Sequence, residues 1–110
     1  MDCKYAYKFT QKAETDLDDI LRYIGEELSN PSAAATFARK LFEAIDNVRN
    51  FPLSAMLLDN EFLSDKNVRR VVVDNYVMYY TVRQSEQTVY VVRIVYGKRN
   101  LEEIYRSLNV

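Results

Sequence analysis

The chain has 110 residues, with 15 lysines and arginines, 16 aspartates and glutamates, a net charge of −1 and no histidine. Its length fits one domain, which we expect to span residues 1–110. Ser-His-Asp and Cys-His catalysis and an HExxH zinc helix are excluded, because each needs histidine. One cysteine cannot build a thiolate zinc site, and two isolated glycines form no phosphate-binding loop. We expect no metal, no cofactor, no membrane contact and a cytoplasmic location.

The first half of the chain predicts a short strand followed by two helices. The strand covers residues 5–10, and apolar residues then recur at helical spacing from Ala13 to Leu28. Thr10 is expected to cap this helix, and Asp18 to pair with Arg22 one turn later. The carboxylates of residues 14–19 suit the positive end of the helix dipole, with a metal site as the alternative. Asn30 and Pro31 begin a second helix, which ends at residues 50–52 and lies antiparallel to the first.

The second half predicts a sheet. Residues 52–67 have no clean period and are expected to form an irregular crossover. Strands follow over residues 68–73, 76–83 and 88–96, joined by an Asp74-Asn75 hairpin turn and by a turn at residues 84–87. A last short helix opens at Asn100. The sequence therefore predicts an α+β fold. A small antiparallel sheet, made of the N-terminal strand and a three-stranded meander, carries an antiparallel helical hairpin on one face and a short C-terminal helix.

The Asp74-Asn75 turn fixes which strand residues share a face. The more apolar face, expected to pack on the helices, contains Arg69, Val71, Val73, Met78 and Tyr80. The other face contains Arg70, Val72, Val77 and Tyr79 and is expected to remain open, basic and aromatic. Arg69 begins its strand and is expected to reach solvent. Arg93 falls on the helix-packed face if the next hairpin keeps its register, and either an ion pair with a helix carboxylate or a binding role fits it.

Charge is distributed unevenly along the chain. Residues 1–66 hold 8 basic and 12 acidic groups, whereas residues 67–110 hold 7 basic and 4 acidic groups, which hints at a polyanionic partner. Lys98 and Arg99 directly follow Gly97, where either a phosphate contact or plain solvation fits. Tyr105 fits either base stacking or simple packing of the last helix.

Several segments together resemble the RelE/ParE superfamily of toxins from type II toxin–antitoxin systems. They are FTQKAETDL at residues 9–17, RYI at 22–24, NFP at 50–52, VVDNYVMYY at 72–80 and RIVYGKR at 93–99. The resemblance implies a growth-inhibiting, plasmid-stabilising toxin that a cognate antitoxin neutralises. It also implies one of two targets. RelE-like members cleave mRNA on the ribosome, and ParE-like members poison DNA gyrase.

The resemblance can be carried over residue by residue. Arg70, Arg99 and Tyr105 match basic and tyrosine positions of the RelE-like nucleases, so they are the catalytic candidates if the chain is RelE-like. A further nuclease arginine corresponds to Val77, and another basic position to Val68. Losing such a donor typically lowers the rate ~100–1000-fold. We therefore favour the ParE-like mode. The alternatives are a ribosome-dependent mRNA endonuclease and an inactive α+β protein-interaction module. Candidate binding residues are Arg69, Tyr79, Arg93 and Lys98.

Overall fold

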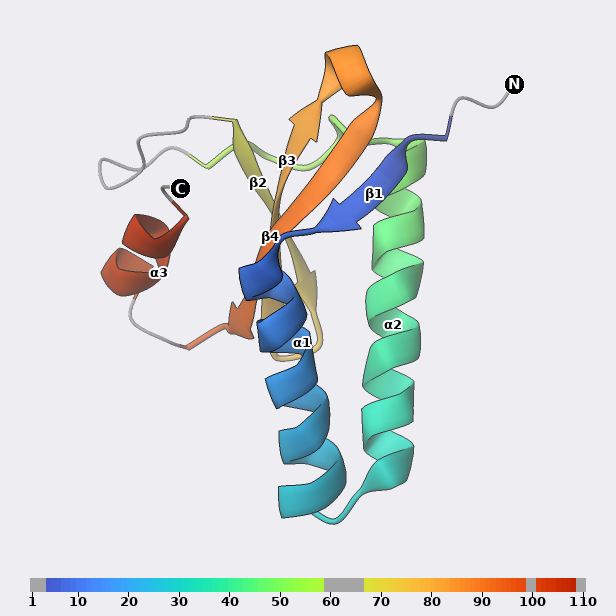
Figure 1. The fold of residues 1–110 in the computed structure, drawn as a ribbon, viewed down its shortest axis with the longest axis vertical. Helices are drawn as coiled ribbons and strands as arrows, with labels where there is room; N and C mark the ends of the chain where they lie inside the picture. Colours follow the sequence, from blue (N-terminus) through green and yellow to red (C-terminus); the bar gives the residue numbers. More distant parts are fainter. Residues whose placement is uncertain (1–3, 59–66, 99–100, 109–110) are drawn as a thin grey trace.

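The computed structural model describes residues 4–58, 67–98 and 101–108. Within these residues three helices and four strands follow one another, with two short helical turns between them (Figure 1). In order they are β1 (Ala6–Phe9), α1 (Gln11–Arg22), a π-helical turn (Tyr23–Glu27), α2 (Pro31–Asn50), β2 (Val68–Val73), β3 (Tyr76–Arg83), a 3-10 turn (Gln84–Glu86), β4 (Thr88–Tyr96) and α3 (Leu101–Ser107). The three meander strands have the predicted bounds. The predicted cap at Asn100 and residues 59–66 of the predicted crossover lie outside the described residues.

The four strands form one sheet in the order β1-β4-β3-β2. β2, β3 and β4 pair antiparallel, as predicted, and β1 joins the edge of β4. That last pairing is parallel, so the sheet is mixed rather than purely antiparallel. A parallel pair needs a long crossover, and the helical hairpin together with β2 and β3 provides one.

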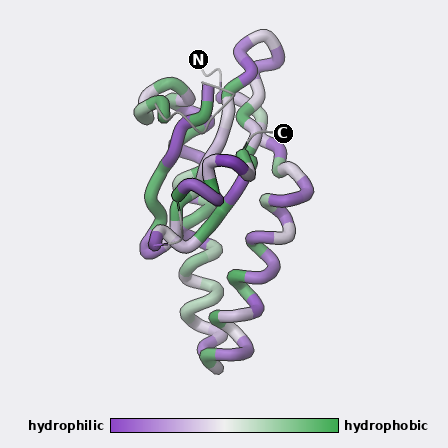
Figure 2. The backbone as a smooth tube through the Cα atoms, turned by 90° about the vertical axis from the view of Figure 1, so that its left-hand side faces the viewer, coloured by the Kyte–Doolittle hydropathy of each residue, from purple (hydrophilic) through white to green (hydrophobic). Residues whose placement is uncertain are grey.

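The ends of the two long helices confirm their predicted caps. The Thr10 hydroxyl accepts a hydrogen bond from the Ala13 amide, and the Asn30 side chain accepts one from the Ala33 amide with Pro31 in the first turn. The predicted ion pair of Asp18 is wrong, because Arg22 lies 3.5 Å from Asp19 instead. The helical hairpin extends well past one end of the sheet in both views (Figures 1 and 2).

The hairpin packs on the face of the sheet that was predicted to be buried. Its core is apolar and joins both helices to three strands. The fully enclosed residues include Ala13, Phe37, Leu41, Ile45, Met78, Tyr80, Val91 and Ile94. The pairing of Val71 with Met78 and of Val72 with Val77 confirms the predicted division of the two faces.

The opposite face of the sheet is not open, and that prediction is wrong. Ile104, Tyr105 and Leu108 of the α3 segment pack on Val77 and other residues of this face and form a second apolar cluster. Tyr79 is 1% exposed and Val77 8% exposed. The reason is physical: the C-terminal helix has its own apolar side, and this sheet face is where that side is removed from water. Arg70 and Val72 belong to β2, the edge strand of the sheet, and remain exposed.

A β-bulge moves Arg93 to the face under α3. Tyr80 pairs with Val91, but the next pair is Tyr79 with Arg93, so Val92 is an extra residue. Without the bulge Arg93 would lie opposite Met78, on the helix-packed face. The predicted position of Arg93 is therefore wrong, because the hairpin does not keep its register.

Candidate functional site

The candidate site lies on the sheet face beneath α3. Arg70 of β2, Tyr79 of β3 and Arg93 of β4 are direct cross-strand neighbours and form one row across the sheet. Tyr105 of α3 meets Tyr79 edge to face, with ring centroids 6.0 Å apart and planes at 84°. Four of the seven predicted site residues thus come together.

Tyr79 and Tyr105 are both buried, and this burial limits the acid–base chemistry that their hydroxyl groups can perform. Burial is the main cause that raises the pKa of Tyr79 to about 12; Tyr105 also raises it, and Arg70 lowers it. Tyr79 therefore stays protonated at neutral pH and serves as a hydrogen-bonding group, not as a base. Tyr105 is 6% exposed, so in this arrangement a substrate has little access to its ring.

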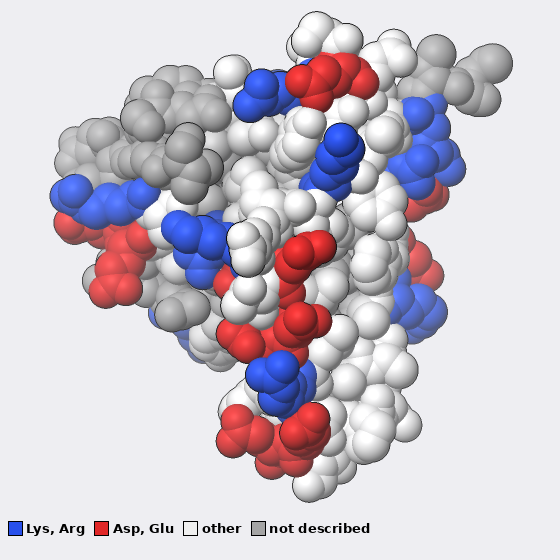
Figure 3. All heavy atoms as spheres, in the orientation of Figure 1, with Lys and Arg blue, Asp and Glu red and all other residues white. Residues whose placement is uncertain are grey.

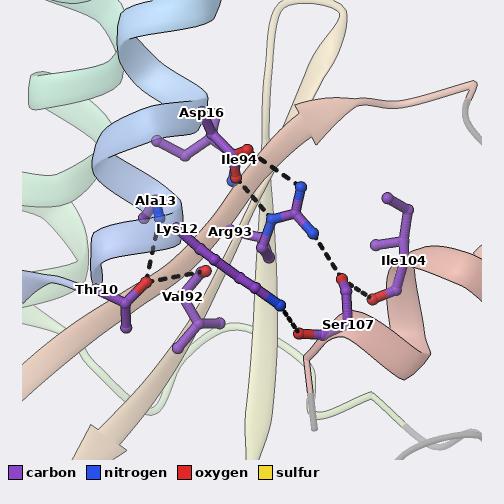
Figure 4. A network of polar contacts seen from close by, with 9 residues as sticks. All are labelled: Thr10, Lys12, Ala13, Asp16, Val92, Arg93, Ile94, Ile104 and Ser107. Carbon is purple, nitrogen blue, oxygen red and sulfur yellow. Dashed lines mark hydrogen bonds and ion pairs between the residues drawn. The ribbon is translucent and has the colours of Figure 1, made fainter. Parts of the chain in front are cut away.

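Arg93 is held in a network that joins three elements (Figure 4). Its Nε and Nη2 donate to the two carboxylate oxygens of Asp16 in α1, at 2.7 and 3.1 Å. Its Nη1 donates to the Ser107 hydroxyl at 2.7 Å, and Lys12 Nζ donates to the Ser107 carbonyl at 3.4 Å. Asp16 also accepts the amide of Ile94 at 2.9 Å. This bidentate geometry supports the ion-pair alternative for Arg93 and ties α3 to α1 through β4.

Two of the remaining predicted residues, Arg69 and Lys98, lie apart from this row. Arg69 is on the opposite face and donates to the carbonyls of Leu53 and Ala55, so it anchors the segment after α2. Lys98 is exposed just after β4. Arg99 lies outside the described residues. Neither Arg69 nor Lys98 is brought to Tyr79 by a described contact.

No metal site is found in the described part of the chain, where no three or more aspartate, glutamate or cysteine residues cluster as ligands. The acidic run on α1 has structural uses instead: Asp16 binds Arg93 and Asp19 binds Arg22. None of the described helices is long and apolar enough to cross a membrane.

Sequence reasoning did not identify Asp16 and Ser107 as the partners of Arg93. The helical spacing placed Asp16 on α1, but only the bulge in β4 brings Arg93 within its reach. Ser107 lies two residues after Tyr105 in the same helix, and no local pattern distinguishes it from a solvated serine. The sequence also gave no sign of an aromatic groove beside Tyr7 and Phe42.

A family profile described as the ParE toxin of the type II toxin–antitoxin system parDE matches residues 7–101. The chain belongs to this family. No curated protein sequence matches it. The ParE-family match runs from the second residue of β1 to the first residue of α3, so it includes both long helices, the three meander strands and all of β1 except its first residue.

Solved structures share this fold at low sequence identity. The chromosomal ParDE system from P. aeruginosa superposes with a TM-score of 0.69 at 18% identity, covering 88% of this chain and 100% of that chain. The RelBE2 complex from Mycobacterium tuberculosis gives 0.60 at 19%, covering 84% and 98%. The archaeal RelE-RelB complex from Pyrococcus horikoshii gives 0.60 at 17%, covering 88% and 99%. All three support the RelE/ParE fold for this chain.

Proposed function

We propose that this ParE-family chain is neutralised by a cognate antitoxin and inhibits growth in the cytoplasm by poisoning DNA gyrase. Solved structures similar to it include a ParDE system and two complexes of a RelE-type toxin with its antitoxin, which supports an antitoxin as partner. We also propose that residues 1–110 form a single toxin domain.

Val77 is the observation that carries the ParE-like mode. It takes the place of an arginine that the resemblance assigns to RelE-like nucleases, and it lies in the apolar cluster under α3. Cleavage by the 2′-hydroxyl of RNA develops negative charge on the phosphate, and a buried valine stabilises none of it. With no histidine in the chain, Tyr79 protonated and Tyr105 buried, the described site lacks an acid–base pair suited to neutral pH.

The second candidate is a ribosome-dependent mRNA endonuclease. One arrangement favours it: Arg70 and Tyr105, two of its three proposed catalytic residues, both contact Tyr79. Arg99, the third, would have to join them. The other alternative is an inactive α+β protein-interaction module, which would neither poison gyrase nor cleave mRNA.

The experiment is induction of the chain without the antitoxin, followed by parallel measurements of translation, mRNA ends and DNA damage. The ParE-like proposal predicts a DNA damage response and gyrase-dependent DNA breaks while protein synthesis continues. Purified toxin incubated with gyrase and supercoiled plasmid should give linear or relaxed DNA, and added antitoxin should prevent this.

Two results would contradict the gyrase proposal. Codon-positioned cuts in translated mRNA, abolished by Arg99→Ala, would identify the endonuclease instead. Normal growth after strong induction would exclude both toxic activities and leave the interaction module. A co-expressed antitoxin is the matched control, because it should relieve either activity.

A further inference from the structure

α3 leaves one end of its sheet face uncovered, next to the turn between β3 and β4. Tyr90 of β4 lies between Lys8 of β1 and Thr81 of β3 in one cross-strand row. Thr81 lies two residues beyond Tyr79 on β3, so this row belongs to the same face of the sheet as Tyr79. Lys8 is exposed, Thr81 and Tyr90 are partly exposed, and none of them belongs to the apolar cluster under α3. This end of the face is therefore accessible to a partner.

Tyr90 holds two neighbouring charged side chains apart. The Arg83 guanidinium lies over its ring, 5.6 Å from the centroid, and its hydroxyl donates to the Glu86 carboxylate at 2.7 Å. Arg83 and Glu86 are only three residues apart at the turn, yet no ion pair joins them. Because Tyr90 engages both side chains, the guanidinium of Arg83 is ordered without being neutralised.

Lys8 and Arg83 are unusual among the basic residues, because most of the others have a polar partner. The described lysines and arginines with an ion pair or a hydrogen bond are Lys4, Lys12, Arg22, Arg39, Lys40, Arg49, Arg69, Arg70, Arg93 and Arg106. Within the described residues, only Lys8, Arg83 and Lys98 have neither. In Figure 3, basic side chains flank a mostly uncharged surface over β1 and the β3–β4 turn, with an acidic group at the turn itself. Two unpaired cations thus lie at the same end of one sheet face.

Unpaired cations on a strand surface fit the phosphate backbone of DNA. From the spacing of strands and residues in a sheet, the Cα atoms of Lys8 and Arg83 lie about 12 Å apart. A DNA strand carries a phosphate about every 3.4 Å along its axis, so both long side chains can reach phosphates of one strand. An arginine that is already ordered also loses little conformational entropy when it binds a phosphate.

A protein partner fits this surface less well. Protein interfaces are anchored by large apolar or aromatic side chains that become buried at their centre. None of the exposed large apolar residues in the described part of the chain belongs to the row of Lys8, Thr81 and Tyr90. Tyr90 itself already has Arg83 on its ring and Glu86 on its hydroxyl.

We propose that Lys8 and Arg83 contact the backbone of duplex DNA, and that Tyr90 is the residue that positions Arg83. The contact does not depend on base sequence, because it involves phosphates only. This inference rests on the proposed poisoning of gyrase, and it adds a direct contact between the toxin and the DNA that gyrase holds. Two phosphate contacts bind weakly alone, so they act by adding to the affinity for gyrase.

The test is a titration of isotope-labelled, refolded full-length toxin with short duplex DNA in the absence of gyrase, followed by NMR at several salt concentrations. NMR measures weak affinities, identifies the amides that respond and shows that each variant is folded. The variants are Lys8→Gln, Arg83→Gln, Tyr90→Phe, and Tyr90→Phe combined with Glu86→Gln. The matched control is Arg39→Gln, which makes the same change in net charge on the exposed surface of α2. Polyglutamate is the second probe, because it offers negative charge on a peptide.

The proposal predicts that the amides around Lys8, Arg83 and Tyr90 respond to DNA. Lys8→Gln and Arg83→Gln should each weaken binding about tenfold at low salt and reduce the slope of log K against log salt by about 1. Tyr90→Phe should weaken binding about two- to fivefold, because the released Glu86 carboxylate then pairs with Arg83. Adding Glu86→Gln to Tyr90→Phe should restore the affinity, which a merely structural role of Tyr90 would not produce. Arg39→Gln should bind like the wild type, and so should duplexes of unrelated sequence to the wild-type toxin.

The possible failures are distinguishable. Unchanged DNA binding by Lys8→Gln and Arg83→Gln, or an equal loss with Arg39→Gln, would overturn the proposed contact. Polyglutamate binding as tight as that of DNA would assign the surface to an acidic protein instead. Because the titration contains no gyrase, these results leave the proposed poisoning of gyrase standing. That proposal is tested separately, by whether the wild-type toxin produces gyrase-dependent DNA breaks.

Discussion

Among the polar contacts of the described residues, the ion pair between Asp16 and Arg93 should be the most sensitive to substitution. Their side chains are only 14% and 15% exposed, and the pair is bidentate. Asp16→Ala would leave the Arg93 guanidinium nearly buried with only the Ser107 hydroxyl as partner, and the Ile94 amide without its acceptor. An uncompensated buried charge is far more costly than the loss of an exposed pair.

The size of the effect follows from this burial. Removing one member of a buried pair costs about 3–5 kcal/mol, and the lower end applies here because some water still reaches both groups. With an unfolding entropy of about 2.1 cal/mol/K per residue, a chain of 110 residues has about 0.23 kcal/mol/K. A loss of about 3 kcal/mol therefore lowers Tm by about 13 °C.

Urea and thermal unfolding of Asp16→Ala, followed by circular dichroism, measure this loss. The control is Asp19→Ala, which breaks an exposed 3.5 Å pair in the same helix and should cost at most about 0.5 kcal/mol. Asp16→Leu with Arg93→Met should recover much of the stability, because no charge is left buried. That double variant also loses the tie to Ser107, so hydrogen exchange in α3 should be faster than in the wild type. A loss below about 1 kcal/mol for Asp16→Ala would refute the argument.

Three further predictions concern stability. The Tyr80 side chain is fully buried, and its hydroxyl has no hydrogen-bond partner in the described part of the chain, so Tyr80→Phe should be neutral or stabilising by up to about 1 kcal/mol in urea unfolding; a clear loss would reveal a hidden partner. Thr10→Ala should cost about 1–2 kcal/mol, because Thr10 caps α1 and also donates to the Val92 carbonyl, whereas Thr10→Ser should retain most of the stability. Tyr79 has a folded-state pKa of about 12 against 10 when unfolded, so its contribution is complete below pH 10 and is lost as the pH rises toward 12. Tyr79→Phe should therefore flatten the alkaline loss of stability, and an unchanged pH profile would contradict this.

The helix caps and the first hairpin turn were predictable from the sequence because local signals determine them. The caps at Thr10 and Asn30 act within one helical turn, and the Asp74-Asn75 turn determines the pairing of β2 with β3. In that turn Asp74 has a positive φ of 54°, a conformation that aspartate tolerates better than most residues. These features needed no knowledge of distant parts of the chain.

Features that depend on distant parts of the chain were not predictable from these patterns. The bulge at Val92 has no local composition that marks it, and it accompanies the contact of Thr10 with the Val91 and Val92 carbonyls from more than 80 residues away. Without that bulge, the partner of Arg93 cannot be deduced. The apolar side of the last helix was visible in the sequence, but which sheet face it covers depends on where the chain returns after β4.

Val77 shows why the sheet face under α3 is better understood as a packing surface than as a damaged nuclease site. Its side chain is 8% exposed, lies opposite Val72 and Val95 in the sheet, and belongs to the apolar cluster that supports Ile104 and Leu108. An arginine in its place would put a charge among the mostly apolar side chains under α3, at a cost of several kcal/mol. One substitution could not both restore a phosphate-binding cation and keep α3 in place. The valine and the helix position are therefore mutually consistent, and together they support a ParE-like mode of action that does not need this cation.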